Sequence, residues 1–192
     1  MTSAGTDPRM YYAVAAVIII ALIFIAVAMS RRNRSAGLQR RFGPEYERTV
    51  RERGNRTEAE RELAQRESRV KKMHIEELPA GAKQRYVEEW RTVQSRFVDE
   101  PQTALAKADS LVTNVMRDRG YPMENFDQRV ADLSPDHPDV VNNYRTAHEI
   151  TARTERGQVS TEDLRQAMIH YRALFDDLVG SDERTVNGIP VS

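Results

Sequence analysis

The longest uninterrupted apolar stretch of this chain of 192 residues runs from Tyr11 to Met29. It contains no charged residue, and Val, Ile, Leu, Phe and Ala fill it so completely that a helix formed there is apolar on every face. Nineteen residues rise roughly 28 Å as an α-helix, close to the thickness of the hydrocarbon part of a bilayer. The pattern therefore predicts one transmembrane helix over 11–29, preceded by a short tail, 1–10.

A different pattern begins near Leu78, where apolar residues recur every three or four positions, the spacing of one helix face. The first series is Leu78, Ala82, Tyr86, Trp90, Val93 and Phe97. Four more series follow before Val179, and Ser160 with Asp163 has the spacing of a capping box at the start of the last one. No segment alternates with period two. The sequence thus predicts an all-α fold, with an antiparallel bundle of about five helices over 77–180 in which consecutive helices are neighbours.

Single residues predict details of this bundle. Trp90 lies within its apolar stripe, so its indole is predicted to lie in the core. Gly180 is predicted to end the last helix, because glycine commonly follows the final helical turn. The tail over 181–192 has no apolar period and is predicted to be disordered.

The segment between the two apolar regions, 30–76, is highly charged. In 44–75, Pro44 suits the first turn of a helix and Gly54-Asn55 predicts a break, so we expect one or two solvated helices acting as a spacer. Leu63 and Val70 lie one heptad apart, which leaves coiled-coil self-association of this connector open.

Arginines beside the apolar run predict its orientation. One of them, Arg9, precedes the run, and five follow it closely: Arg31, Arg32, Arg34, Arg40 and Arg41. Because basic residues stay on the cytoplasmic side, we expect a single-pass cell-membrane protein with its N-terminus outside and its C-terminal domain in the cytoplasm. The alternative is a signal peptide cleaved near Ala26-Val27-Ala28, although the apolar run is longer than signal peptides need.

Charge is unevenly distributed although the net charge is zero. The stretch 31–72 has fourteen basic and seven acidic residues, whereas 73–192 has fourteen basic and twenty-one acidic ones. The five arginines can contact anionic lipid headgroups, but fixing the orientation already accounts for them. Interleaved acids and few aromatic residues argue against nucleic-acid binding, and the lack of cysteine excludes disulfides and thiolate metal sites.

Motifs for catalysis are missing from the sequence. It has no Gly-x-Ser-x-Gly elbow, no HExxH and no glycine-rich phosphate loop. The four histidines, His74, His137, His148 and His170, have no partner histidine at helical ligand spacing. The adjacent acids Glu88-Glu89 and Asp176-Asp177 are predicted to be solvated. We therefore expect no catalytic residue, no cofactor and no metal.

Two loops with distinctive composition are the best candidates for contact with a protein partner. They are Arg119–Pro122, which follows a predicted helix end, and Asp136–Asp139, where Pro138 is predicted to begin the next helix. The candidate partner-binding residues are Arg119, Tyr121, Asp136 and His137.

Several longer stretches together resemble a family of uncharacterised bacterial single-pass membrane proteins. They are LQRRFGPEYER, FVDEPQTALAKADSLV, VMRDRGYP, QRVADLSPDHPDVV and LRQAMIHYRALFDDL, within roughly residues 38–179. The resemblance implies a bacterial cell-envelope setting, and it implies no activity and no site.

These observations favour a membrane-anchored helical interaction module, an adaptor or scaffold, that contacts the lipid bilayer and a protein partner. A secreted or periplasmic binding domain is the alternative if the apolar run is cleaved. The other class is an enzyme, a hydrolase or transferase that uses scattered acids and histidines, and a pocket containing two of His137, His148 and His170 would favour it.

Overall fold

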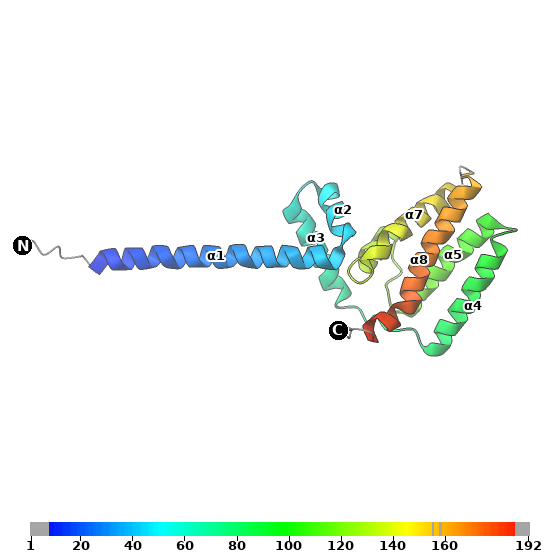
Figure 1. The fold of residues 1–192 in the computed structure, drawn as a ribbon, viewed down its shortest axis with the longest axis horizontal. Coiled ribbons are helices and arrows are strands. Elements are labelled where there is room, and N and C mark those ends of the chain that lie inside the picture. Colours follow the sequence, from blue (N-terminus) through cyan, green and yellow to red (C-terminus); the bar gives the residue numbers. More distant parts are fainter. Residues whose placement is uncertain (1–7, 155, 158, 187–192) are drawn as a thin grey trace, which may run out of the picture. The chain divides into compact units, whose positions relative to one another are not determined.

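The computed structural model describes residues 8–154, 156–157 and 159–186, and within them it contains eight helices and no strand (Figure 1). The helices are α1 (Pro8–Phe42), α2 (Pro44–Arg53), α3 (Arg56–Val70), α4 (Ala80–Arg96), α5 (Pro101–Asp118), α6 (Phe126–Leu133), α7 (Pro138–Thr154) and α8 (Thr161–Val186). The all-α prediction is confirmed. The chain divides into two compact units, Met1–Arg40 and Arg41–Ser192, and each is described by itself.

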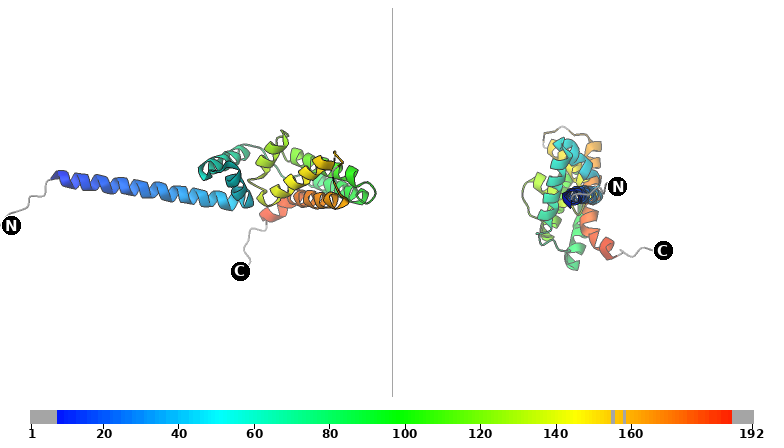
Figure 2. Two further views of the ribbon diagram at one scale, coloured as in Figure 1. Left: turned by 90° about the horizontal axis from the view of Figure 1, so that it is seen from above. Right: turned by 90° about the vertical axis from the view of Figure 1, so that its left-hand side faces the viewer.

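Helix α1 is one unbroken helix that includes both the apolar run and the arginine-rich segment after it (Figure 2). Large apolar side chains are exposed along it: Ile18, Ile19, Ile20, Leu22, Ile23, Phe24, Ile25 and Met29. The side chains of 8–17, Val27 and Arg31 lie outside the described set. Within the part of the chain that is described, no helix is both long enough and apolar enough to cross a membrane.

Glycine and proline separate the first three helices. Gly43 has a φ of +47°, which glycine adopts at little cost, and Pro44 then occupies the first turn of α2. Gly54 ends α2 in the left-handed conformation, and the side chain of Asn55 accepts hydrogen bonds from the backbone of Thr57 and Glu58 at the start of α3. The predicted break at Gly54-Asn55 is confirmed.

The pair α2 and α3, here called the hairpin, is packed rather than solvated. Helix α2 lies against α7, and α3 lies against α6. Tyr46, Ala59 and Leu63 are almost fully buried, and so are Glu45 and Thr49. The expected spacer is therefore a folded part of the Arg41–Ser192 unit, which begins well before the predicted bundle boundary at 77. The low apolar content of α2 and α3 did not predict this packing, because charged side chains make much of the contact.

The five predicted helices of the bundle are confirmed as α4 to α8, but their order in space differs from the expectation. Helix α4 packs on α5, and α8 then lies between α5 and α7 (Figure 1). The short α6 packs on α7 and α3 instead of on its predecessor α5. Trp90 stacks on Phe175 of α8 with ring centroids 4.7 Å apart, so its predicted core position is confirmed.

The two ends of α8 show one confirmed prediction and one wrong one. Ser160 and Asp163 form the predicted capping box, because each accepts a hydrogen bond from the backbone N–H of the other. Gly180 does not end the helix, which continues to Val186. Glycine ends a helix where it takes a positive φ, and Gly180 does not. Residues 181–186 are therefore helical, and the rest of the predicted tail, 187–192, lies outside the described residues.

Candidate functional site

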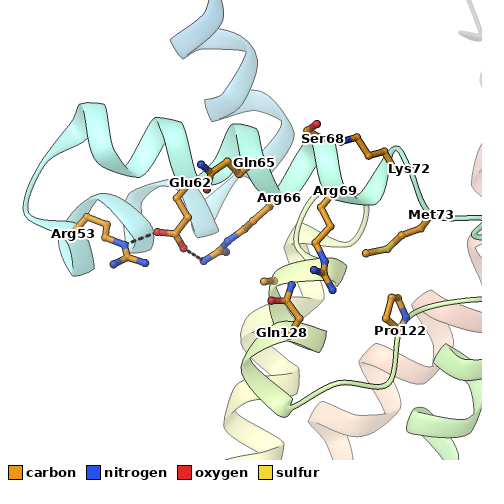
Figure 3. A pocket seen from close by; sticks show the side chains of 11 residues that line it. Arg53, Glu62, Gln65, Arg66, Ser68, Arg69, Lys72, Met73, Pro122 and Gln128 are labelled. Carbon is orange, nitrogen blue, oxygen red and sulfur yellow. Dashed lines mark hydrogen bonds and ion pairs between the residues drawn. The ribbon is translucent and has the colours of Figure 1, made fainter.

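A groove of about 740 Å³, lined mainly by charged and polar residues, lies between α3 and the segment that contains α6 (Figure 3). Basic side chains outnumber acidic ones in its lining, which includes Arg53, Glu62, Arg66, Arg69, Lys72 and Gln128. A second hollow of about 500 Å³ shares Arg53, Glu62, Arg66 and Gln128 with the first. Together they mark a charged seam between the hairpin and the bundle, here called the seam.

Carboxylates hold most of the guanidinium groups of the seam in place. Glu62 accepts hydrogen bonds from both Arg53 and Arg66, drawn as dashed lines in Figure 3. Burial raises the pKa of Glu62, but these two arginines outweigh it and bring the pKa below its ordinary value. The arginines that line the groove are therefore already paired with carboxylates.

Glu45 is the buried centre of this charge network, with 3% of its surface exposed. Its two oxygens accept from Arg145 of α7 at 2.6 and 2.7 Å, and one of them also accepts from Arg66 at 2.9 Å. Burial acts to raise the pKa of Glu45, whereas the hydrogen bonds and charges of Arg145 and Arg66 lower it, and the net pKa is lowered. One ionised glutamate thus joins α2, α3 and α7.

Asp132 of α6 is the second buried carboxylate of the seam. One oxygen, Oδ1, accepts from Arg69 Nε at 3.0 Å and from Gln128 Nε2 at 2.8 Å. The other, Oδ2, is buried and has no hydrogen-bond partner among the described residues. Burial raises the pKa of Asp132 in spite of its bonds from Gln128 and Arg69. Its ionised form is therefore held at a cost in free energy.

Three of the four predicted partner-binding residues are buried. Arg119 donates to the carbonyl oxygen of Leu178 at 2.7 Å, and His137 Nδ1 contacts Asp177 Oδ2. The Tyr121 ring lies 6.4 Å from the His137 ring. The structure thus brings Arg119, Tyr121 and His137 together beside α8, inside the unit rather than on its surface.

Asp136 is the exposed member of the predicted set, and it accepts a hydrogen bond from Arg41 at 2.8 Å. Arg41 also pairs with Glu67, so this arginine of the five is engaged within its own unit. Arg32, Arg34 and Arg40 are exposed on α1, and Arg31 has no described side chain.

Sequence reasoning missed the burial of Asp177, which was expected to be solvated together with Asp176. Asp176 is exposed and pairs with Arg172, as expected for a surface acid. Asp177 lies about 60° around the helix from Leu174, on the edge of the apolar face. This position at the edge of the apolar face was the feature of the sequence that could have predicted a buried carboxylate.

The three histidines considered for an enzyme, His137, His148 and His170, each contact different residues. His170 contacts Asn143 at 3.0 Å, while the His148 ring stacks on Phe126 with centroids 3.7 Å apart. His148 Nδ1 is 3.9 Å from Asp109, too far for a hydrogen bond, and Asp109 instead accepts from Tyr171 at 2.8 Å. Among the described residues, no cluster of three or more histidines and acids is arranged to hold a metal ion.

Comparison of the chain with family models, curated proteins and solved structures gives no match.

Proposed function

We propose that this protein is a membrane-anchored helical interaction module, with residues 11–29 in the bilayer and the Arg41–Ser192 unit available to a protein partner. The observation that supports an anchor is the exposure of the apolar side chains of α1. All eight large ones that the structure describes between Ile18 and Met29 are more than half exposed, from 52% at Ile18 to 77% at Phe24.

Lipid fits this surface better than a single protein partner does. The exposed residues include Ile18, Ile19 and Ile20 in succession and then Leu22 to Ile25, so they point in all directions around the helix. A groove in a partner protein covers one stripe of a helix, whereas a bilayer surrounds it. The length of the anchor is taken from the sequence, because the side chains of 11–17 are outside the described set.

The proposed orientation rests on the arginines that follow the apolar run. Arg32, Arg34 and Arg40 are exposed on the continuous helix α1, where their charges oppose transfer through the membrane. We place the Arg41–Ser192 unit in the cytoplasm, and the bacterial cell-envelope setting is part of the same proposal.

Binding rather than catalysis is the proposed role of the folded unit. Its ionisable side chains form structural pairs, such as Glu45 with Arg145 and His137 with Asp177, and these pairs already satisfy one another. Residues 73–192 carry an acidic excess, so the proposed partner has a basic face. Confinement to the same membrane raises the local concentration of both proteins, so a weak contact is sufficient.

Membrane fractionation of the full chain tests the anchor. We expect the protein to stay with membranes after a wash at alkaline pH and its mass to include residues 1–29. A double variant, Ile20→Lys with Ile23→Lys, is expected to be released, because each charge at the centre of a span costs about 2.5–3.5 kcal/mol. The matched control is Arg32→Gln with Arg34→Gln. A mature mass that starts after Ala28 would support the secreted alternative instead.

A further inference from the structure

We infer that the hairpin, Pro44–Val70, is held on the bundle by a polar latch and detaches from it as a unit while α4 to α8 stay folded. This inference concerns the Arg41–Ser192 unit alone and holds whether or not α1 crosses a membrane. It assigns a conformational role to the seam.

The first observation is that the apolar residues of the hairpin are not part of the main core. The contiguous core begins at Leu78, with Ile75 packed against it, and continues into α8. Tyr46, Ala59, Leu63 and Val70 are buried, yet in the described part of the chain they do not belong to that core. The hairpin therefore has apolar contacts of its own that persist when it leaves the bundle.

The second observation is that charged and polar groups connect the hairpin to the bundle. The contacts are Glu45 with Arg145, Arg66 with Ser134 at 3.5 Å, Arg69 with Asp132 at 3.0 Å, and Arg69 with Glu124 at 2.8 Å. The groove of Figure 3 lies in the same seam, so the two surfaces do not close over a continuous apolar patch.

Polar contacts of this kind can be exchanged for water. When the seam opens, each charged group regains hydration, so opening costs less than exposing the apolar core of the bundle. Cooperative units of different stability within one domain follow from such differences. The seam is thus the weakest connection in the Arg41–Ser192 unit.

Two buried carboxylates act on the latch in opposite directions. Glu45 favours the closed state, since it accepts from Arg145 and Arg66 and is completely paired. Asp132 favours the open state, because its Oδ2 is buried without a partner among the described residues and water would satisfy it. Their opposition leaves the closed state favoured by a modest margin.

The chain on each side of the hairpin supplies a hinge. On one side is Gly43, with its positive φ. On the other side are the exposed residues Lys71 and Lys72, before the chain is fixed again by a hydrogen bond from Glu76 N–H to the Arg119 carbonyl at 2.9 Å. Opening therefore requires a change of backbone angles only at these two places and no unfolding of the bundle.

Hydrogen exchange on the full chain in detergent micelles tests this inference. We expect the amides of α2 and α3 to exchange at a lower opening free energy than those of α5 and α8, because two short helices fray once they leave the bundle. Glu45→Gln removes the centre of the latch, and it is expected to speed exchange of α2 and α3 roughly tenfold with little change in α5 and α8. The matched control is Glu52→Gln, which removes an exposed partner of Arg48 on the same helix and is expected to change neither group.

If Glu45→Gln speeds hydrogen exchange equally in α2, α3, α5 and α8, the inference is overturned, since the hairpin and bundle would then be one cooperative unit. If this variant does not fold, Arg69→Gln loosens the half-exposed end of the seam and is read in the same way. The chain has no cysteine, so Arg61→Cys with Glu162→Cys provides two unique spin-label positions on exposed residues. A second, longer distance that becomes more populated in Glu45→Gln supports the latch, and one unchanged distance contradicts it.

Discussion

Individual residues show how steric and polar constraints fix the loops of this unit. Gly120 has a φ of +94°, and a Cβ atom there would lie 2.2 Å from the carbonyl oxygen of His74. The chain before α4 therefore passes directly over the end of α5, where Arg119 also bonds the Glu76 carbonyl. Both positions are structural, which explains why the distinctive Arg119–Pro122 loop has the composition it has.

We expect Gly120→Ala to lower the free energy of unfolding by roughly 2 kcal/mol or more, because it combines an unfavourable φ with a clash against backbone. Gly81→Ala is the matched control, since Gly81 lies in α4 with open space around its added methyl group. That change is expected to be neutral or to stabilise by about 0.5–1 kcal/mol. Urea denaturation of both variants measures the difference, and equal effects would contradict the close approach.

Two substitutions of Tyr121 distinguish a structural role of this residue from a partner-binding role. Its hydroxyl is buried without a hydrogen-bond partner among the described residues, and burial raises its pKa. Tyr121→Phe is therefore expected to leave stability unchanged or to raise it by up to about 1 kcal/mol, whereas Tyr121→Ala lowers it by about 3–5 kcal/mol. Thermal melts followed by circular dichroism check both values. A melting point that drops for Tyr121→Phe would mean that the hydroxyl is bonded.

Trp90 is expected to be one of the most costly core residues to truncate. Trp90→Ala removes a ring that is 4% exposed and stacked on Phe175, so the free energy of unfolding should fall by about 3–5 kcal/mol. Denaturation followed by circular dichroism measures it, because the variant has lost its single tryptophan. A loss below about 1 kcal/mol is incompatible with a core position.

At the level of helices, the charge network around Glu45 determines how the hairpin is attached. Glu45→Gln removes the negative charge that Arg145 and Arg66 pair with, so we expect the free energy that holds the hairpin on the bundle to fall by about 1.4 kcal/mol at neutral pH, the equivalent of tenfold faster exchange. Hydrogen exchange of α2 and α3 in the full chain at pH 7 gives the value. Glu52→Gln, at an exposed pair, is expected to cost less than about 0.5 kcal/mol.

The stability difference between the natural chain and Glu45→Gln is expected to depend on pH. Burial opposes ionisation of Glu45, but Arg145 and Arg66 bring its folded pKa below the free value of 4.5. Its ionisation therefore stabilises the fold above about pH 4.5, and this contribution is lost as pH falls through the lower folded pKa. The stability difference between the natural chain and Glu45→Gln should narrow below pH 4.5. A difference that is constant down to pH 3 would argue against this assignment.

The helices with regular apolar stripes were predictable from sequence, and the packing of the charged ones was not. The series through Trp90 and the capping box at Ser160 specify local structure by themselves. Burial of Glu45 and Asp132 depends on Arg145 and Arg69, which are far away in sequence, and a single sequence does not reveal such pairs. Gly180 was misleading because a glycine within a helix costs only about 1 kcal/mol, which neighbouring packing offsets.

For the molecule as a whole, the arginines after the apolar run are expected to control topology. Neutralising Arg31, Arg32, Arg34, Arg40 and Arg41 together should give mixed orientation of a reporter fused after Ser192, whereas the natural chain is expected to give cytoplasmic activity alone. Arg41 also contacts Asp136 and Glu67, so a variant that keeps Arg41 separates topology from stability. An active periplasmic reporter on the natural chain would contradict the proposed orientation.

The unbroken course of α1 has a mechanical consequence. A straight α-helix turns by about 100° per residue, so Arg32, Arg34 and Arg40 keep a fixed angle to the apolar residues that precede them on α1. One alanine inserted after Ser30 would turn these arginines by about 100° about the helix axis, while seven inserted alanines would restore the angle to within about 20°. A contact that depends on this angle should fail with one alanine and return with seven, a periodic response that a flexible segment cannot produce.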